Sequence, residues 1–291
     1  MTTGSDRIRA AFARAHAEGR AAFMPYQMLG HPSLQASPAV ITALADAGGD
    51  LFELGLPFSD PLADGPTVQA AGQQALDNGI TVARCLDMVA DLRRQLPDPP
   101  FCLMGYINPI LAYGAERFLR AAAEAGVDGL IVPDLPPDEP EAEEMAALCG
   151  RFGIAPIYLL APTSTADRIE MGVLRSQGFV YLVSVTGTTG ARAGLPADLG
   201  DFVQRVRRIA AQRPASERPY VAVGFGIGTP EIAAQVAQIA DGVIVGSALV
   251  KLAGSSERPA EDVAALGKSL RDAARRAIAE PGDISDPSTA E

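Results

Sequence analysis

Short apolar segments recur along the whole chain, and most of them are continuously apolar instead of alternating with polar residues. Continuous apolar runs of this length are typical of parallel strands that are buried on both faces. Eight runs are therefore predicted as strands: Phe23–Leu29, Leu51–Phe58, Phe101–Ile107, Gly129–Leu135, Ala155–Ala161, Phe179–Val185, Tyr220–Ile227 and Gly242–Val245.

Helical patterns, with apolar residues three or four positions apart, precede the first run and separate many of the others. They cover Ser5–Arg20, Val40–Ala47, Val82–Leu96, Glu116–Ala125, Pro140–Cys149, Phe202–Ala211 and Glu231–Ala240. Eight strands that alternate with helices predict a (β/α)8 barrel of the TIM type with one extra helix at its N-terminus. An open, doubly wound sheet is the alternative that this pattern leaves.

The spacing of the runs adds detail to the barrel. The two longest intervals follow the second and the sixth run, which predicts long loops after strands 2 and 6. Such loops lie on the face where barrel enzymes carry their chemistry. A chain of 291 residues fits one barrel, so residues 1–280 are expected to form a single domain. Residues 281–291 are rich in Pro, Ser and Asp and are expected to be a disordered tail.

Composition narrows the classes of partner. The net charge of −11 disfavours nucleic acid and anionic membrane surfaces, because both repel an acidic protein. Neither an apolar signal core nor a run long enough to span a membrane is present. Cys85, Cys102 and Cys149 are far apart and lack metal-ligand spacing, as expected for buried thiols in a reducing cytoplasm. A cytoplasmic protein without a bound metal is the expectation.

Two glycine clusters follow the last two predicted strands: Gly224–Gly228 and Gly246-Ser247. Loops after strands 7 and 8 commonly bind phosphate in these barrels, and glycine lets backbone N–H groups reach the phosphate oxygens. We therefore expect a phosphate site there, although the same glycines could serve only as tight turns.

An acidic residue, Glu53, lies inside the apolar second run. Glu is seldom fully buried without a partner or a purpose, and an apolar environment raises its pKa toward values useful for proton transfer. Asp60 and Asp64 follow in the next loop. A structural ion pair at Glu53 and solvated turns at the two aspartates are the alternatives.

Other common catalytic groups are poorly placed. Neither Lys251 nor Lys268 ends a strand, which disfavours a Schiff-base aldolase. His16 is predicted in the first helix and His31 in a turn, so carboxylate acid–base catalysis is the chemistry that remains.

The segment Leu54–Thr67 (LGLPFSDPLADGPT) closely resembles the signature of the tryptophan synthase α subunit family. The likeness covers nearly the whole chain and is highly specific. Further segments follow in family order: Pro133–Pro136, Ala161–Thr163, Ser184–Gly190, Gly224–Gly226 and Gly246–Ala248.

The resemblance implies a lyase that cleaves indole-3-glycerol phosphate to indole and D-glyceraldehyde 3-phosphate by a retro-aldol reaction. It implies no cofactor for this chain. Indole would pass through a tunnel to a β subunit that holds pyridoxal phosphate and makes L-tryptophan, in an α2β2 heterotetramer.

The same resemblance assigns roles to individual residues. Glu53 corresponds to the proton donor to indole C3, and Asp64 to the acceptor of the indole N–H. The predicted substrate-binding residues are Tyr26, Leu103, Tyr181, Thr189, Gly190, Phe225, Gly226, Gly246 and Ser247. Pro57 and Asp60 are expected to contact the β subunit. The first strand departs from the usual family pattern at Tyr26 and at Gln27–His31, which affects the expected shape of the pocket.

Two other functions are compatible with the fold. The chain could be a stand-alone lyase that releases free indole, or an inactive barrel that only activates a β subunit. The presence of both Glu53 and Asp64 argues against the inactive barrel.

Overall fold

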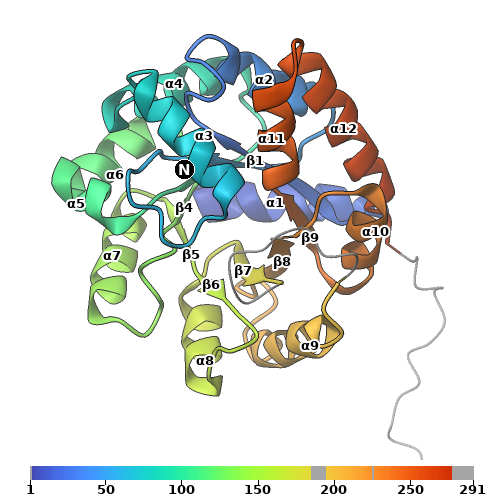
Figure 1. The fold of residues 1–291 in the computed structure, drawn as a ribbon. Helices are drawn as coiled ribbons and strands as arrows, with labels where there is room; N and C mark the ends of the chain where they lie inside the picture. The colour runs from blue at the N-terminus through green and yellow to red at the C-terminus, as the bar shows by residue number, and fades with distance from the viewer. Residues whose placement is uncertain (1, 185–194, 225, 277–291) are drawn as a thin grey trace, which may run out of the picture.

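All strands of the computed structural model are parallel and form one sheet (Figure 1). The structure describes residues 2–184, 195–224 and 226–276. The strands are β1 (Ala22–Met28), β2 (Phe52–Gly55), β3 (Phe101–Met104), β4 (Gly129–Ile131), β5 (Ala155–Ile157), β6 (Leu159–Leu160), β7 (Phe179–Val183), β8 (Tyr220–Gly224) and β9 (Gly242–Val245). Their order is β5-β4-β3-β2-β1-β9-β8-β7-β6.

The two ends of this order belong to one predicted run, Ala155–Ala161, which is interrupted at Tyr158. Its first half, β5, pairs with β4, and its second half, β6, pairs with β7. The carbonyl of Tyr158 itself accepts a hydrogen bond from the N–H of Tyr181 (3.1 Å). The nine short strands therefore make a nearly closed barrel, as the sequence predicted, and not an open doubly wound sheet.

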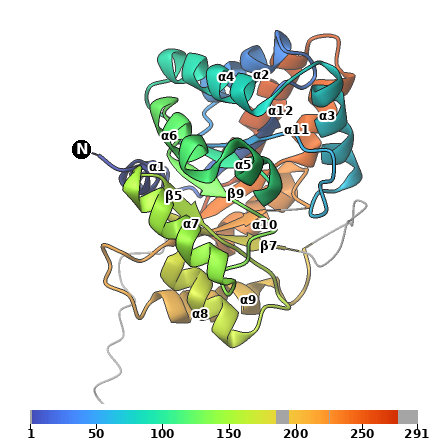
Figure 2. The ribbon, with the colours of Figure 1, turned by 90° about the vertical axis from the view of Figure 1, so that its left-hand side faces the viewer.

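Helices surround the barrel (Figures 1 and 2). They are α1 (Gly4–Ala17), α2 (Ala36–Asp46), α3 (Pro66–Asp77), α4 (Val82–Gln95), α5 (Ile107–Tyr113), α6 (Ala115–Glu124), α7 (Pro140–Arg151), α8 (Ala166–Arg175), α9 (Leu199–Ala210), α10 (Pro230–Ile239), α11 (Ser247–Ser255) and α12 (Pro259–Ala273). The segment predicted as a long loop after strand 2 is in fact a loop followed by α3, so part of the extra length is helical.

The predicted N-terminal helix is α1, and it closes the end of the barrel at which the strands begin. Its Phe12 lies against Gly242, the first residue of β9, where a Cβ would come within 2.8 Å of the ring. Its Ile8 packs in the same way on Gly178, just before β7. The loops that carry the predicted site lie at the opposite end, where the strands finish. In Figure 2, α1 lies at the left, and α3 and α11 lie at the right.

Candidate active site

Glu53 points into the barrel. Its neighbour Phe52 packs edge-on against Phe101 (ring centroids 6.1 Å apart), and the Arg93 guanidinium of α4 lies 4.1 Å from the Phe101 centroid. Phe52 and Phe101 therefore face the helices. Because successive side chains of a strand point to opposite faces, Glu53 and its register partner Cys102 face the interior.

The Glu53 carboxyl group is buried, with 1% of the residue exposed. Neither carboxyl oxygen has a hydrogen-bond partner among the described residues. Burial raises the pKa of Glu53 to about 8, with a further contribution from the negative charge of Asp64. Glu53 is thus protonated at neutral pH, which suits a proton donor.

Asp64 lies in the loop between β2 and α3 and is also buried, with 7% exposed. Burial raises its pKa to about 6, whereas a hydrogen bond from the Tyr106 hydroxyl acts in the opposite direction. The Tyr106 oxygen also accepts the N–H of Ala63 (3.0 Å), and Gln69 donates its side-chain amide to the Asp64 carbonyl (2.8 Å). The loop therefore holds Asp64 in place, and at neutral pH the structure pairs a neutral Glu53 with an ionised Asp64.

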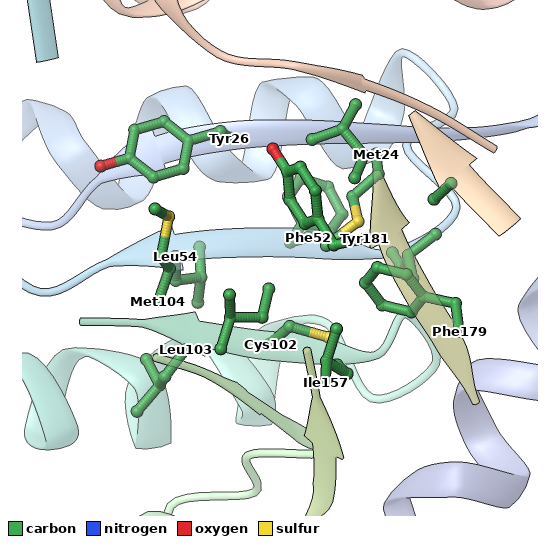
Figure 3. Packing of buried hydrophobic residues seen from close by; sticks show 14 of the residues in the cluster. Met24, Tyr26, Phe52, Leu54, Cys102, Leu103, Met104, Ile157, Phe179 and Tyr181 are labelled. Carbon is green, nitrogen blue, oxygen red and sulfur yellow. The ribbon is translucent and has the colours of Figure 1, made fainter. Parts of the chain in front are cut away.

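Two buried tyrosines flank Glu53. Tyr26 of β1 is its register partner, and Tyr181 comes from β7 on the other side of the barrel (Figure 3). Burial, followed by neighbouring carboxylates, raises the pKa of both phenols, so both stay neutral. The position of each phenol hydroxyl requires a glycine on a neighbouring strand. A Cβ at Gly55 would lie 2.2 Å from the Tyr26 oxygen, and one at Gly224 would lie 2.4 Å from that of Tyr181.

The prediction for Leu103 is wrong. Leu103 is paired with Leu54, and both lie one position beyond inward-facing residues, so they face the helices. The side chain that faces the interior at the end of β3 is Met104, which is buried at 6% exposure (Figure 3). Sequence reasoning also missed Tyr106, two positions further along. Because side chains alternate between the two faces of a strand, an inward-facing Cys102 predicts that residues 104 and 106 also face inward, and this alternation could have identified Tyr106.

The predicted phosphate residues that the structure describes come together. Gly246 precedes Ser247, the first residue of α11, and a Cβ at Gly228 would lie 3.5 Å from that of Ala248 in the same helix. Gly226 has φ +74°, which favours glycine, and Ser247 and Gly226 are both exposed. The loop after β8 therefore lies beside the N-terminus of α11, where backbone N–H groups favour anions. Thr189, Gly190 and Phe225 lie outside the described residues.

Of the two predicted partner-contact residues, Asp60 is exposed and Pro57 is buried. The structure thus presents Asp60 at the surface, while Pro57 packs within the chain. Among the described residues no group of three or more His, Cys, Asp or Glu side chains could hold a metal ion. In the same part of the chain, no helix has both the length and the apolar character needed to cross a membrane.

Comparisons with known proteins identify the family. The family model of the tryptophan synthase alpha chain matches residues 12–277. The chain belongs to that family. A tryptophan synthase alpha chain from Deinococcus radiodurans is 48% identical over 273 residues, covering 94% of this chain and 96% of its own.

Solved structures lead to the same family. Tryptophan synthase from Mycobacterium tuberculosis is 38% identical with a TM-score of 0.82, covering 92% of this chain and 98% of its own. A tryptophan synthase alpha chain from Legionella pneumophila is 35% identical with a TM-score of 0.77, covering 92% and 96%. The family resemblance read from Leu54–Thr67 is therefore confirmed.

Proposed function

We propose that this chain cleaves indole-3-glycerol phosphate to indole and D-glyceraldehyde 3-phosphate, as the α subunit of a tryptophan synthase. The observation that carries the assignment to these residues is the pair of buried carboxyl groups, with a pKa of about 8 for Glu53 and about 6 for Asp64. Two acids whose surroundings separate their pKa values can act as proton donor and anion in one site. Family membership supports the same reaction.

The proposed reaction begins with proton transfer from neutral Glu53 to C3 of the indole ring, which makes the ring a leaving group. The Glu53 carboxylate then accepts the proton of the C3′ hydroxyl. As the C3–C3′ bond breaks, its electron pair returns to the ring and the carbinol carbon becomes the aldehyde. Glu53 ends protonated as it began, so the atoms and charges balance.

Asp64 would stabilise the positive charge that develops on the indole nitrogen after protonation at C3. A fixed negative charge is most effective where charge appears only in the transition state and water is excluded. The burial of Asp64 and its hydrogen bond from Tyr106 provide that environment. Tyr26, Tyr181 and Met104 would pack around the ring of the substrate.

The substrate phosphate would bind where the loop after β8 meets α11, on the backbone N–H groups of Gly226, Gly246 and Ser247. Thr189, Gly190 and Phe225 are proposed to complete this part of the site. This end of the substrate anchors the molecule but takes no part in bond cleavage. The proton transfers proposed for Glu53 require no cofactor in this chain. Pyridoxal phosphate is expected only in the partner.

The partner is proposed to be a β subunit, in an α2β2 assembly, that binds at the end of the barrel where the strands finish. Exposed apolar side chains support this position: Leu62, in the loop after β2, is 86% exposed, and Leu111 of α5 is 57% exposed. Asp60 lies in the same loop as Leu62 and is exposed. A cytoplasmic location stays a prediction from the sequence.

The decisive measurement is release of indole from indole-3-glycerol phosphate by the purified chain, with and without a β subunit. We expect slow release alone and faster release in the complex. Equal rates would favour the stand-alone lyase. If neither preparation releases indole while the chain still stimulates the β subunit, the inactive activating barrel is the better description.

A further inference from the structure

A second group of charged residues lies at the opposite end of the barrel from Glu53. A cavity of about 440 Å³ opens there, beside the first residue of β8, Tyr220, and beside Asp241, which precedes β9. Helices α1 and α9 form its other walls. We call it the basal cavity. None of the residues discussed above for the lyase reaction lines it.

The basal cavity is strongly basic in an acidic protein. The arginines that line it are Arg9, Arg207, Arg218 and Arg276, and its single acidic residue is Asp241. Four positive charges and one negative charge leave an excess of three, although the chain as a whole carries −11. Charge of one sign concentrated in a concave site attracts ions of the opposite sign.

The single carboxylate is already used. Asp241 accepts hydrogen bonds from Arg207 (2.8 Å) and Arg276 (3.3 Å), and from the backbone N–H of Val221 (2.9 Å). His16 also lies against it, but burial and the adjacent Arg276 lower the pKa of the imidazole, so His16 adds no charge at neutral pH.

Arg9 and Arg218 have no ion-pair partner among the described residues. Arg9 donates to the backbone carbonyls of Arg218 (2.6 Å) and Ala215 (3.0 Å), and Arg218 donates to that of Ala211 (3.0 Å). These bonds hold the side chains in place without neutralising them. Arg207 has a further unused group, since its Nε–H is buried without an acceptor within the described part of the chain. Because this N–H is closed off from solvent, it lies behind the surface of the cavity.

The aromatic ring in the cavity limits the chemistry of that ligand. Tyr220 is stacked on Phe12 (centroids 4.7 Å apart, planes at 6°), and the Arg9 guanidinium lies 5.6 Å from its centroid. With Phe12 stacked on the ring and the Arg9 guanidinium over it, Tyr220 offers little free surface to a flat ligand. A nucleotide base is thus disfavoured, whereas planar guanidinium groups match the geometry of phosphate oxygens.

We propose that the basal cavity binds a tetrahedral dianion, either inorganic phosphate or a compact phosphomonoester, between Arg9, Arg207 and Arg218. The ligand would neutralise the excess charge of the arginines. It would also join α1 and α9 to the bases of β8 and β9, so binding is expected to stabilise the barrel by mass action.

The test is an NMR titration of the full-length chain that follows the Arg207 Nε–H resonance, assigned by its loss in Arg207→Lys. Inorganic phosphate, glycerol 3-phosphate and sulfate are added separately. Because the signal is local, phosphate that binds at the distant α11 site does not interfere. A saturating shift with inorganic phosphate or glycerol 3-phosphate is expected, and comparison of their affinities identifies which source of the dianion the cavity prefers.

Variants make the result specific. Arg218→Gln should weaken binding roughly ten-fold, the change expected for one lost charge-assisted hydrogen bond. Arg208→Gln is the matched control, because Arg208 is exposed on the same helix as Arg207 and does not line the cavity; it should leave the affinity unchanged. If Arg218→Gln does not fold, Arg9→Gln replaces it.

Two outcomes would overturn the proposal. One is an Arg207 resonance that does not shift with any of the three anions, or that shifts equally in wild type and Arg218→Gln. The other concerns the carboxylates of Glu280, Asp283, Asp286 and Glu291, which follow Arg276 in the chain. If replacing these carboxylates by amides moves the Arg207 resonance without added anion and greatly tightens phosphate binding, the chain itself occupies the cavity. If the variant binds phosphate within about two-fold of the wild-type affinity, the proposal is supported.

Discussion

The hydroxyl oxygen of Tyr26 occupies the space that a side chain at Gly55 would need, since a Cβ at Gly55 would lie 2.2 Å from it. Gly55 follows Glu53 on the inner face of β2, and Tyr26 is the register partner of Glu53. Gly55 therefore leaves the space that the Tyr26 hydroxyl occupies next to Glu53, the proposed proton donor.

Gly55→Ala should force Tyr26 toward Glu53 or out of its place. We expect a stability loss of about 1–3 kcal/mol from overpacking, and a fall in cleavage of about 100-fold, because displacements near 1 Å have that effect in positioned sites. Thermal unfolding and indole release measure the two effects. Gly65→Ala is the matched control, since a Cβ there meets nothing within 4 Å. Equal activity of the two variants would contradict the role given to Tyr26.

Glu53→Gln keeps the shape of the side chain but cannot exchange a proton. Cleavage should fall by roughly 10²–10⁴-fold with the fold intact. Activity within a few-fold of wild type would remove Glu53 from the mechanism.

The same variant tests the raised pKa of Glu53 through stability. Between its ordinary value of 4.5 and about 8, the folded state holds a proton that the unfolded state has released. The stability of the wild type should therefore fall as the pH rises through this window, and level off above it. Glu53→Gln lacks this contribution. Relative to the wild type, the free energy of unfolding of the variant should therefore rise by a few kcal/mol between pH 4.5 and 8.5, measured by urea unfolding. If the difference in the free energy of unfolding between variant and wild type stays constant across this pH window, the Glu53 carboxyl is ionised in the folded state.

Asp64→Asn removes the charge but still accepts a hydrogen bond. If Asp64 stabilises charge only in the transition state, kcat should fall by about 100-fold or more while KM changes little. Steady-state kinetics separate the two constants. An increase in KM alone would make Asp64 a binding residue.

Tyr106→Phe removes the hydroxyl that donates to Asp64 and accepts the N–H of Ala63. Because that hydrogen bond lowers the pKa of Asp64, its loss should raise the value above about 6. The acid limb of the kcat/KM profile should consequently move to higher pH, with activity at pH 8 less affected. Tyr113→Phe, in α5, is the control. An unmoved acid limb would separate Tyr106 from the ionisation of Asp64.

Gly226→Val places a branched side chain at φ +74° beside the proposed phosphate site. The strained backbone should cost about 1–3 kcal/mol. Gly153→Val is a matched control for strain alone, because Gly153 has φ +70° and a Cβ there meets nothing within 4 Å. Only Gly226→Val should weaken binding of glycerol phosphate at this site, measured as its inhibition constant for indole release, which binding in the basal cavity does not enter. Equal binding by the two variants would place the phosphate elsewhere.

The family, the barrel and the proposed acids could all be read from the chain because each depends on local pattern. Continuous apolar runs separated by amphipathic helices predicted parallel strands, and an acid within such a run marked Glu53. The segment Leu54–Thr67 was specific enough to predict the family, which the comparisons confirmed.

Other features depend on which face of a strand a residue occupies and on neighbours that are distant in the chain. The third run is apolar on both faces, so nothing in its composition separates Leu103 from Met104; only pairing with β2 shows that Met104 faces inward. The break at Tyr158 arises because one run must pair with β4 on one side and β7 on the other. Only the closed barrel brings together the side chains behind three further features: the separation of the two pKa values, the contact of Tyr106 with Asp64, and the arginines around Asp241. Burial and charge depend on these distances, which the sequence does not show.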